Sequence, residues 1–157
     1  MHSQSSEAHP CQRRAVDPPN RSPVVERDVR NVEELHATRY QRILIVEDEI
    51  FVRLDVEQQL SAAGYDVVGQ ADTADEAVKI ALAEKPDVVL MDIRLRGARD
   101  GIDAALEIRQ RLNIACIFVS ANTDPATMRR AQTAQPLGFV TKPFTLPALV
   151  AAMTPKN

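Results

Sequence analysis

Short apolar runs recur along the chain, and longer stretches with helical spacing separate them. The runs lie at residues 43–46, 67–68, 88–91, 114–119 and 137–140. The run from Val88 to Met91 shows neither alternation nor helical spacing, which indicates a strand buried on both faces. Strands that alternate with helices predict a parallel sheet with right-handed crossovers and helices on both faces.

The helical stretches carry their own signals for where each helix begins and ends. The predicted helices begin near Ile50, Thr73, Gly101, Asp124 and Leu146. Gly64 is a natural stop for the first, and Thr73 to Glu76 has the spacing of a capping box for the second. Asp124 followed by Pro125 suits the N-cap and first position of the fourth. The chain therefore contains five β-α units.

Five such units most commonly give the strand order 2-1-3-4-5, which is the doubly wound, flavodoxin-like α/β fold. Strands 1 and 3 are then neighbours, and ligands bind at the carboxyl ends of the strands where they meet. Glu47 and Asp48 follow strand 1, and Asp92 ends strand 3. We therefore expect three carboxylates to converge in one crevice. Such a cluster needs a compensating cation, and carboxylate oxygens suit Mg²⁺.

The next two strand ends supply groups that complement these acids. Ser120 ends strand 4 beside the small residue Ala121, and strand 5 leads into Lys142. Taken singly, Ser120 is typical of a turn and Lys142 of a solvated surface. Together with the acids they predict a site for a divalent cation and a phosphoryl group, with Asp92 as the nucleophile that forms an aspartyl phosphate.

Residues 1–40 differ in composition from the rest of the chain. Prolines interspersed with Ser, Arg, Gln and Asn leave few apolar residues to bury, which is typical of a disordered tail. Val25, Val29, Val32 and Leu35 recur at near-helical spacing and predict a short helix near residues 23–38. We expect a mostly disordered tail over 1–40 and one folded domain over 41–157. A tail that folds against a partner, or a start codon placed too far upstream, are the alternatives.

Composition and charge exclude several classes of protein. A length of 157 residues with 45% hydrophobic content suits one domain with a proper core, and a net charge of −3 offers no electrostatic footprint for direct nucleic-acid binding. Neither a membrane-spanning apolar run nor an apolar signal core is present in the sequence, so we expect a cytoplasmic protein. Cys11 and Cys116 indicate neither a disulfide framework nor a metal site, and Cys116 is expected to be a core thiol.

The set Glu47-Asp48, Asp92, Ser120 and Lys142-Pro143, in this order and on these elements, resembles the receiver domain of two-component response regulators, of the chemotaxis-receiver type. The resemblance covers roughly residues 41–155. It implies that Asp92 accepts a phosphoryl group from a histidine kinase or a histidine phosphotransfer protein.

The resemblance also implies a role for the neighbours of Asp92. Mg²⁺ would be held by Asp48 and Asp92, by Glu47 directly or through water, and by the backbone carbonyl of Arg94. Lys142 would neutralise charge on the transferred group.

A switch is implied as well. Ser120 would bond the phosphoryl group and move strand 4, and Phe139 would turn inward. The surface of helix 4, strand 5 and helix 5 would then change its affinity for a partner. The Lys142-Pro143 peptide is expected to be cis.

Several residues depart from the pattern of the family. Glu47 replaces the more frequent aspartate, and Phe139 stands where many relatives have tyrosine. The loop from Asp92 to Asp100 contains three arginines, which is more basic than expected beside a metal site; they are Arg94, Arg96 and Arg99. Arg94 and Asn122 lie two residues beyond Asp92 and Ser120, and we predict that they set how fast water removes the phosphoryl group.

The preferred hypothesis is a single-domain response regulator that binds a protein partner or drains phosphoryl groups from a kinase, and that catalyses only its own phosphorylation and dephosphorylation. We expect a monomer or a weak dimer, because the last helix is short. One alternative is a phosphatase or phosphotransferase with an aspartyl intermediate, although an enzyme of the haloacid dehalogenase type would need aspartate at the position of Arg94. The other is a receiver-like binding module that is never phosphorylated.

Overall fold

The computed structural model describes residues 40–121 and 123–154. The predicted tail helix near residues 23–38 and Asn122 lie outside the described residues. The described residues form five strands, with the bounds β1 (Arg42–Val46), β2 (Asp66–Ala71), β3 (Val88–Asp92), β4 (Ala115–Ser120) and β5 (Gly138–Thr141). Five helices follow them in alternation, with the bounds α2 (Ile50–Ala62), α3 (Ala74–Glu84), α4 (Gly101–Leu112), α5 (Pro125–Gln132) and α6 (Leu146–Met153). None of the helices in these ranges is long and apolar enough to cross a bilayer.

The strands form one parallel sheet in the order β2-β1-β3-β4-β5, which confirms the predicted topology. β3 and β4 are buried along their whole length, as their apolar runs indicated. β2 extends beyond the predicted run 67–68 and includes Gly69 and Gln70. It is an edge strand, so its side chains are only partly covered and no continuous apolar run marks it.

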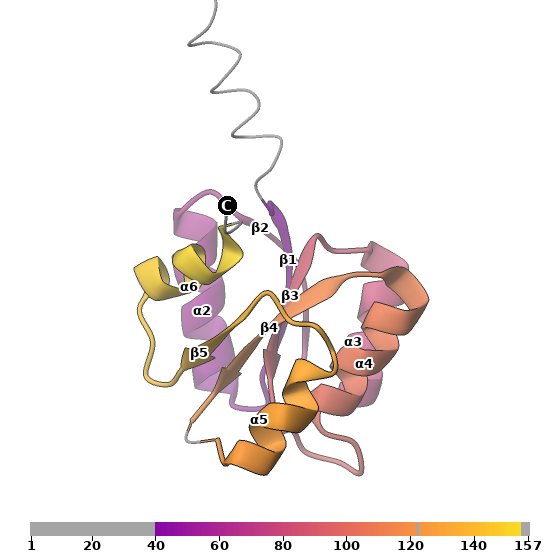
Figure 1. Cartoon of the computed structure of the whole chain (residues 1–157). Helices are drawn as coiled ribbons and strands as arrows, with labels where there is room; N and C mark the ends of the chain where they lie inside the picture. The colour runs from indigo at the N-terminus through magenta and orange to yellow at the C-terminus, as the bar shows by residue number, and fades with distance from the viewer. Residues whose placement is uncertain (1–39, 122, 155–157) are drawn as a thin grey trace, which may run out of the picture. The chain divides into compact units, whose positions relative to one another are not determined.

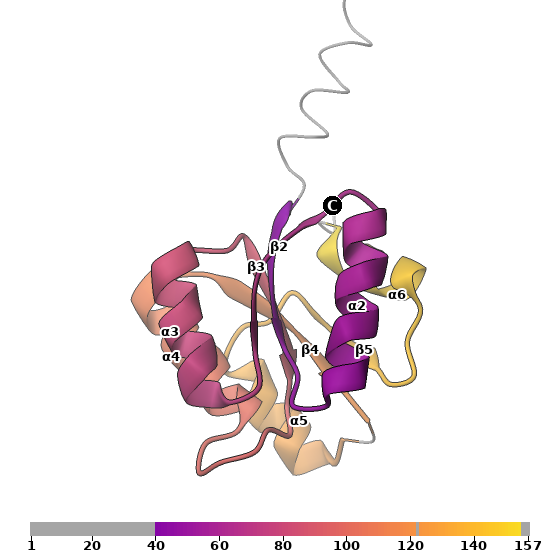
Figure 2. The same cartoon turned by 180° about the vertical axis from the view of Figure 1, so that it is seen from behind.

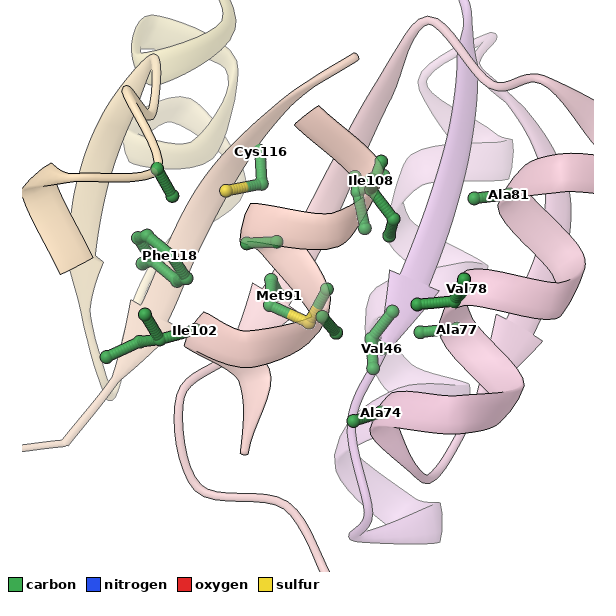
Figure 3. Close-up of a cluster of buried hydrophobic side chains, with 14 of the residues drawn as sticks. Val46, Ala74, Ala77, Val78, Ala81, Met91, Ile102, Ile108, Cys116 and Phe118 are labelled. Carbon is green, nitrogen blue, oxygen red and sulfur yellow. The ribbon is translucent and has the colours of Figure 1, made fainter. Parts of the chain in front are cut away.

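Two helical layers cover the sheet, with α2 and α6 on one face and α3 and α4 on the other (Figures 1 and 2). Successive side chains of a strand point to opposite faces, so Leu44 and Val46 pack in one core cluster and Ile43 and Ile45 in the other. Figure 3 shows the first cluster, in which Val46, Met91 and Phe118 come from three adjacent strands. The doubly wound fold is thus confirmed.

Cys116 lies in the same cluster and is 3% exposed, which confirms the predicted core thiol. Burial raises the pKa of this thiol to about 12. The side chain therefore remains protonated and packs as an apolar group.

Helix ends follow local signals, with one difference from the prediction. Gly64 adopts a φ of +91°, and the Tyr65 N–H donates to the Leu60 carbonyl at 3.0 Å, which closes α2 as expected. At α3, Thr73 accepts from the Glu76 N–H at 3.2 Å, but the Glu76 carboxylate accepts from the Asp72 N–H at 3.4 Å. The predicted capping box is therefore only half formed.

A complete capping box lies instead at the start of α4. Asp100 accepts from the Asp103 N–H at 3.0 Å, and Asp103 accepts from the Asp100 N–H at 3.1 Å. This reciprocal pair fixes the end of the loop that begins at Asp92.

Candidate functional site

Three carboxylates meet at the carboxyl ends of β1 and β3. Glu47, Asp48 and Asp92 each place one carboxylate oxygen within 4.8 Å of the others. β1 and β3 are paired neighbours, so the residues that follow Val46 and Met91 must lie side by side. Glu47 is 5% exposed and Asp92 is 7% exposed, and two acids so buried and so close need compensation. We refer to these three residues as the acidic cluster.

Lys142 supplies part of this compensation from the end of β5. Its Nζ donates to Glu47 Oε2 at 2.5 Å and to Asp92 Oδ2 at 2.9 Å. Burial lowers the pKa of the ammonium group, but its hydrogen bonds to the two carboxylates outweigh that effect, and the pKa is raised above its ordinary value. Lys142 is therefore a permanent cation between Glu47 and Asp92 at neutral pH.

The backbone around Lys142 holds the side chain in place. Its N–H donates to the Ser120 carbonyl at 2.8 Å, which extends the pairing of β4 with β5. The Lys142-Pro143 peptide bond is cis, as predicted.

Backbone donors orient the two buried acids. The Arg94 N–H donates to Asp92 Oδ1 at 3.1 Å, and the Glu49 N–H donates to Glu47 Oε1 at 3.0 Å. The Arg53 guanidinium on α2 also donates to the Glu47 carbonyl at 2.6 Å. No motif in the sequence predicted this last contact, because Arg53 lies six positions along the chain on a mostly exposed helix.

Asp48 has a different partner. The Arg96 Nε lies 3.7 Å from Asp48 Oδ2, and the Arg96 side chain is 78% exposed. The unusual number of arginines in this loop was visible in the sequence, but which of them faces the acidic cluster was not.

Ser120 ends β4 and Phe139 lies on the paired strand β5, and both residues line one pocket. Ser120 is 8% exposed, and its hydroxyl accepts a hydrogen bond from the Thr123 hydroxyl at 3.3 Å. Phe139 is partly buried and stacks on Phe118, with ring centroids 5.7 Å apart. A pocket of about 190 Å³ is lined by both residues together with Thr123 and Met128. Space for a rearrangement of these side chains is therefore present.

The loop after Asp92 is fixed at its far end by an ion-pair network. Arg130 on α5 lies 2.5 Å from Asp100 Oδ2 and 2.7 Å from Asp103 Oδ1. Burial raises the pKa of Asp100, but the hydrogen bonds from Arg130 and from the Asp103 N–H outweigh it, and the pKa lies below its ordinary value. The network ties α5 to the first turn of α4.

The donors in the acidic cluster fit a hard divalent cation. Carboxylate oxygens are the ligands that Mg²⁺ prefers, and the acids already lie close enough to share one ion. The involvement of the Arg94 carbonyl stays a prediction. Arg94 lies within the described residues and is exposed, whereas Asn122 lies outside them.

Comparison with known proteins identifies the class that has this fold and site. The chain matches the response regulator receiver domain over residues 43–154, and it belongs to this family. Proteins of the family act in bacterial two-component systems, are typically phosphorylated on aspartate and bind Mg²⁺ in an acidic pocket. The resemblance inferred from the sequence is thereby confirmed.

Individual relatives show how far the similarity extends. The transcriptional regulatory protein PdtaR of Mycobacterium tuberculosis is 37% identical over 113 residues, which cover 72% of this chain and 55% of PdtaR. The chemotaxis protein CheY of Thermotoga maritima is 37% identical over 114 residues, which cover 72% of this chain and 94% of CheY.

A solved structure agrees with these relatives. The signal receiver domain of a modulated diguanylate cyclase from Desulfovibrio desulfuricans G20 has a TM-score of 0.68 and 36% identity, over 71% of this chain and 88% of that domain. This chain spans about half the length of PdtaR, so the similarity concerns the receiver domain and not the whole of that protein.

Proposed function

We propose that this protein is a response regulator in which Asp92 accepts a phosphoryl group from a histidine kinase or a histidine phosphotransfer protein. The observation that carries the proposal is the contact of the buried Asp92 carboxylate with Lys142 inside the acidic cluster. This arrangement combines a nucleophile, a fixed cation and oxygen ligands for a metal at one strand edge.

The transfer itself needs few groups. An Asp92 carboxylate oxygen attacks phosphorus, the bond from phosphorus to the donor's imidazole nitrogen breaks, and that nitrogen leaves with the electron pair. Glu47, Asp48, Asp92 and the Arg94 carbonyl would hold Mg²⁺, which offsets charge on the phosphoryl oxygens. Lys142 lies 2.9 Å from Asp92 Oδ2 and would also neutralise charge on the phosphoryl oxygens.

We propose that the donor docks over α2. Ile50, Phe51 and Leu54 are 53%, 85% and 49% exposed, an unusual exposure for large apolar side chains. Beside them a groove of about 520 Å³, lined by Phe51 and Phe144, leads to Lys142. A helical donor that covers this patch would bring its histidine to the acidic cluster.

The output would pass through Ser120 and Phe139. In the described conformation the Ser120 hydroxyl accepts a hydrogen bond from the Thr123 hydroxyl. Once Asp92 carries a phosphoryl group, Ser120 would turn to it, and Phe139 would move further into the pocket that it lines. The surface of α5, β5 and α6 would then favour a protein partner, as a shift between two conformers.

Asp92→Asn tests the proposal directly. We expect the wild-type chain, incubated with Mg²⁺ and acetyl phosphate, to gain one phosphoryl group by intact mass, and NMR amide signals near Ser120 and Phe139 to shift. The variant keeps the shape of the side chain, loses the nucleophile and should show neither change. EDTA should abolish the reaction of the wild type.

Two results would overturn this proposal. Identical behaviour of the wild type and Asp92→Asn would leave a receiver-like binding module. Release of phosphate over many turnovers, beyond slow loss from the phosphorylated chain, would favour a phosphatase with an aspartyl intermediate.

The lifetime of the phosphorylated state offers a further test. Arg94 and Asn122 are proposed to flank the phosphoryl group and to control the access of water. We expect Arg94→Ala and Asn122→Ala each to change the rate of dephosphorylation, measured as the decay of the phosphorylated mass after the donor is removed. A rate unchanged in both variants would rule out this role.

A further inference from the structure

The two cations at the acidic cluster divide the carboxylates between them. Lys142 bonds Glu47 and Asp92, and Arg96 pairs with Asp48. Among the described residues, the three carboxylates thus form ion pairs with two cationic side chains before any metal binds. Within the described ranges, Asp48 forms its ion pair with Arg96 and not with Lys142.

The backbone of Arg96 is anchored by a strand-type bridge, whereas its side chain lies largely in solvent. Arg96 forms an isolated parallel bridge with Thr73, the N-cap residue of α3, which fixes the loop beside the acidic cluster. The side chain is 78% exposed and reaches Asp48 from the solvent. The guanidinium can therefore leave Asp48 without becoming a buried unpaired charge.

We propose that Arg96 is the counter-ion of Asp48 in the metal-free protein, and that it competes with the divalent cation for this carboxylate. A divalent cation bound at Asp48 would neutralise the carboxylate charge that the Arg96 guanidinium neutralises in the metal-free protein. The cation and the guanidinium repel each other, so the guanidinium must release Asp48 when the cation binds. Arg96 thereby weakens the binding of Mg²⁺ and makes it depend on the loop that carries Arg96. The inference rests on the metal site of the proposed function.

The geometry sets the size of the effect. An exposed pair separated by 3.7 Å contributes little free energy in water, so removing it should tighten Mg²⁺ binding by about two- to fivefold. Salt screens such a pair, and the difference between the variant and the wild type should shrink as ionic strength rises.

Mg²⁺ titrations of the full chain test this role, by calorimetry or by amide shifts in NMR spectra. We expect Arg96→Ala to lower the dissociation constant by about two- to fivefold and Arg96→Lys to lie closer to the wild type. Arg99→Ala is the matched control, because it removes an arginine from the same loop whose guanidinium pairs with Asp75 and Glu107. It should leave the dissociation constant close to that of the wild type.

A second measurement follows the guanidinium itself. The Nε–H signal of Arg96 should shift on addition of Mg²⁺ to the wild type, and Asp48→Asn should abolish this response. Equal affinities for wild type and Arg96→Ala, or an equal gain in Arg99→Ala, would overturn the role of Arg96 while leaving the metal site intact. Failure of the wild type to bind Mg²⁺ would instead overturn the metal site, and with it this inference.

Discussion

Gly101→Ala should destabilise the protein by about 3 kcal/mol or more, the largest loss expected from a glycine-to-alanine substitution in this fold. A Cβ at Gly101 would lie 1.8 Å from the carbonyl oxygen of Asp92 and 2.8 Å from its carbonyl carbon. Both atoms are backbone, so no flexible side chain can move aside. The Gly101 N–H also donates to the Ile93 carbonyl at 2.9 Å, which holds the two segments together.

The free energy of unfolding, measured with urea, checks this expectation. Gly138→Ala is the matched control, because a Cβ there meets only Ala152 Cβ at the ordinary contact distance of 3.7 Å. Its stability should stay within about 1 kcal/mol of the wild type. A Gly101→Ala protein as stable as this control would show that the backbone after β3 can shift at no cost.

The substitution should also affect the chemistry at Asp92. Its added methyl group presses on the carbonyl of the residue that is proposed to take the phosphoryl group. We expect the Gly101→Ala protein that remains folded to be phosphorylated by acetyl phosphate more slowly than Gly138→Ala.

Lys142→Met should destabilise the protein by about 2–3 kcal/mol at neutral pH. Removal of the ammonium group leaves Glu47 and Asp92 buried, adjacent and without the donor that joins them. The Lys142 side chain is 23% exposed, so water offsets part of the penalty. Lys79→Met, which removes an exposed lysine from α3, is the control and should stay within about 0.5 kcal/mol of the wild type.

The pH dependence follows from the raised pKa of Lys142. A cation with a raised pKa in the folded state contributes its full stabilisation below the ordinary lysine value of 10.5 and loses it as pH rises through the folded pKa. The difference in the free energy of unfolding between the wild type and Lys142→Met should therefore be constant from neutral pH to about pH 10. Above about pH 10 this difference should decrease.

Mg²⁺ should partly replace the missing ammonium group. We expect Mg²⁺ to raise the melting temperature of Lys142→Met more than that of the wild type, because the variant has the larger uncompensated charge. A Lys142→Met protein that matches the wild type with and without Mg²⁺ would show that the two buried acids need no fixed cation.

The local sequence was sufficient for most of the fold. β3 and β4 were predictable because burial on both faces leaves an unbroken apolar run, and α2 because Gly64 supplies the positive φ that ends it. β2 was predicted too short, since an edge strand keeps polar residues such as Gln70. The capping box was predicted at Thr73, although the complete box lies at Asp100. Residue spacing alone does not determine which backbone N–H a carboxylate in the first turn of a helix accepts from.

The sequence by itself predicted that Glu47, Asp48 and Asp92 converge, because five alternating β-α units most commonly adopt the strand order 2-1-3-4-5, in which strands 1 and 3 are neighbours. Only the tertiary structure decided how the charges pair. Lys142 reaches Glu47 across 95 residues of chain and Asp92 across 50, and no spacing in the sequence specifies these two acids as its partners. The same holds for Arg96 beside Asp48. The pairing of particular cationic side chains with particular carboxylates follows no periodic pattern of residues, so it cannot be predicted from the sequence.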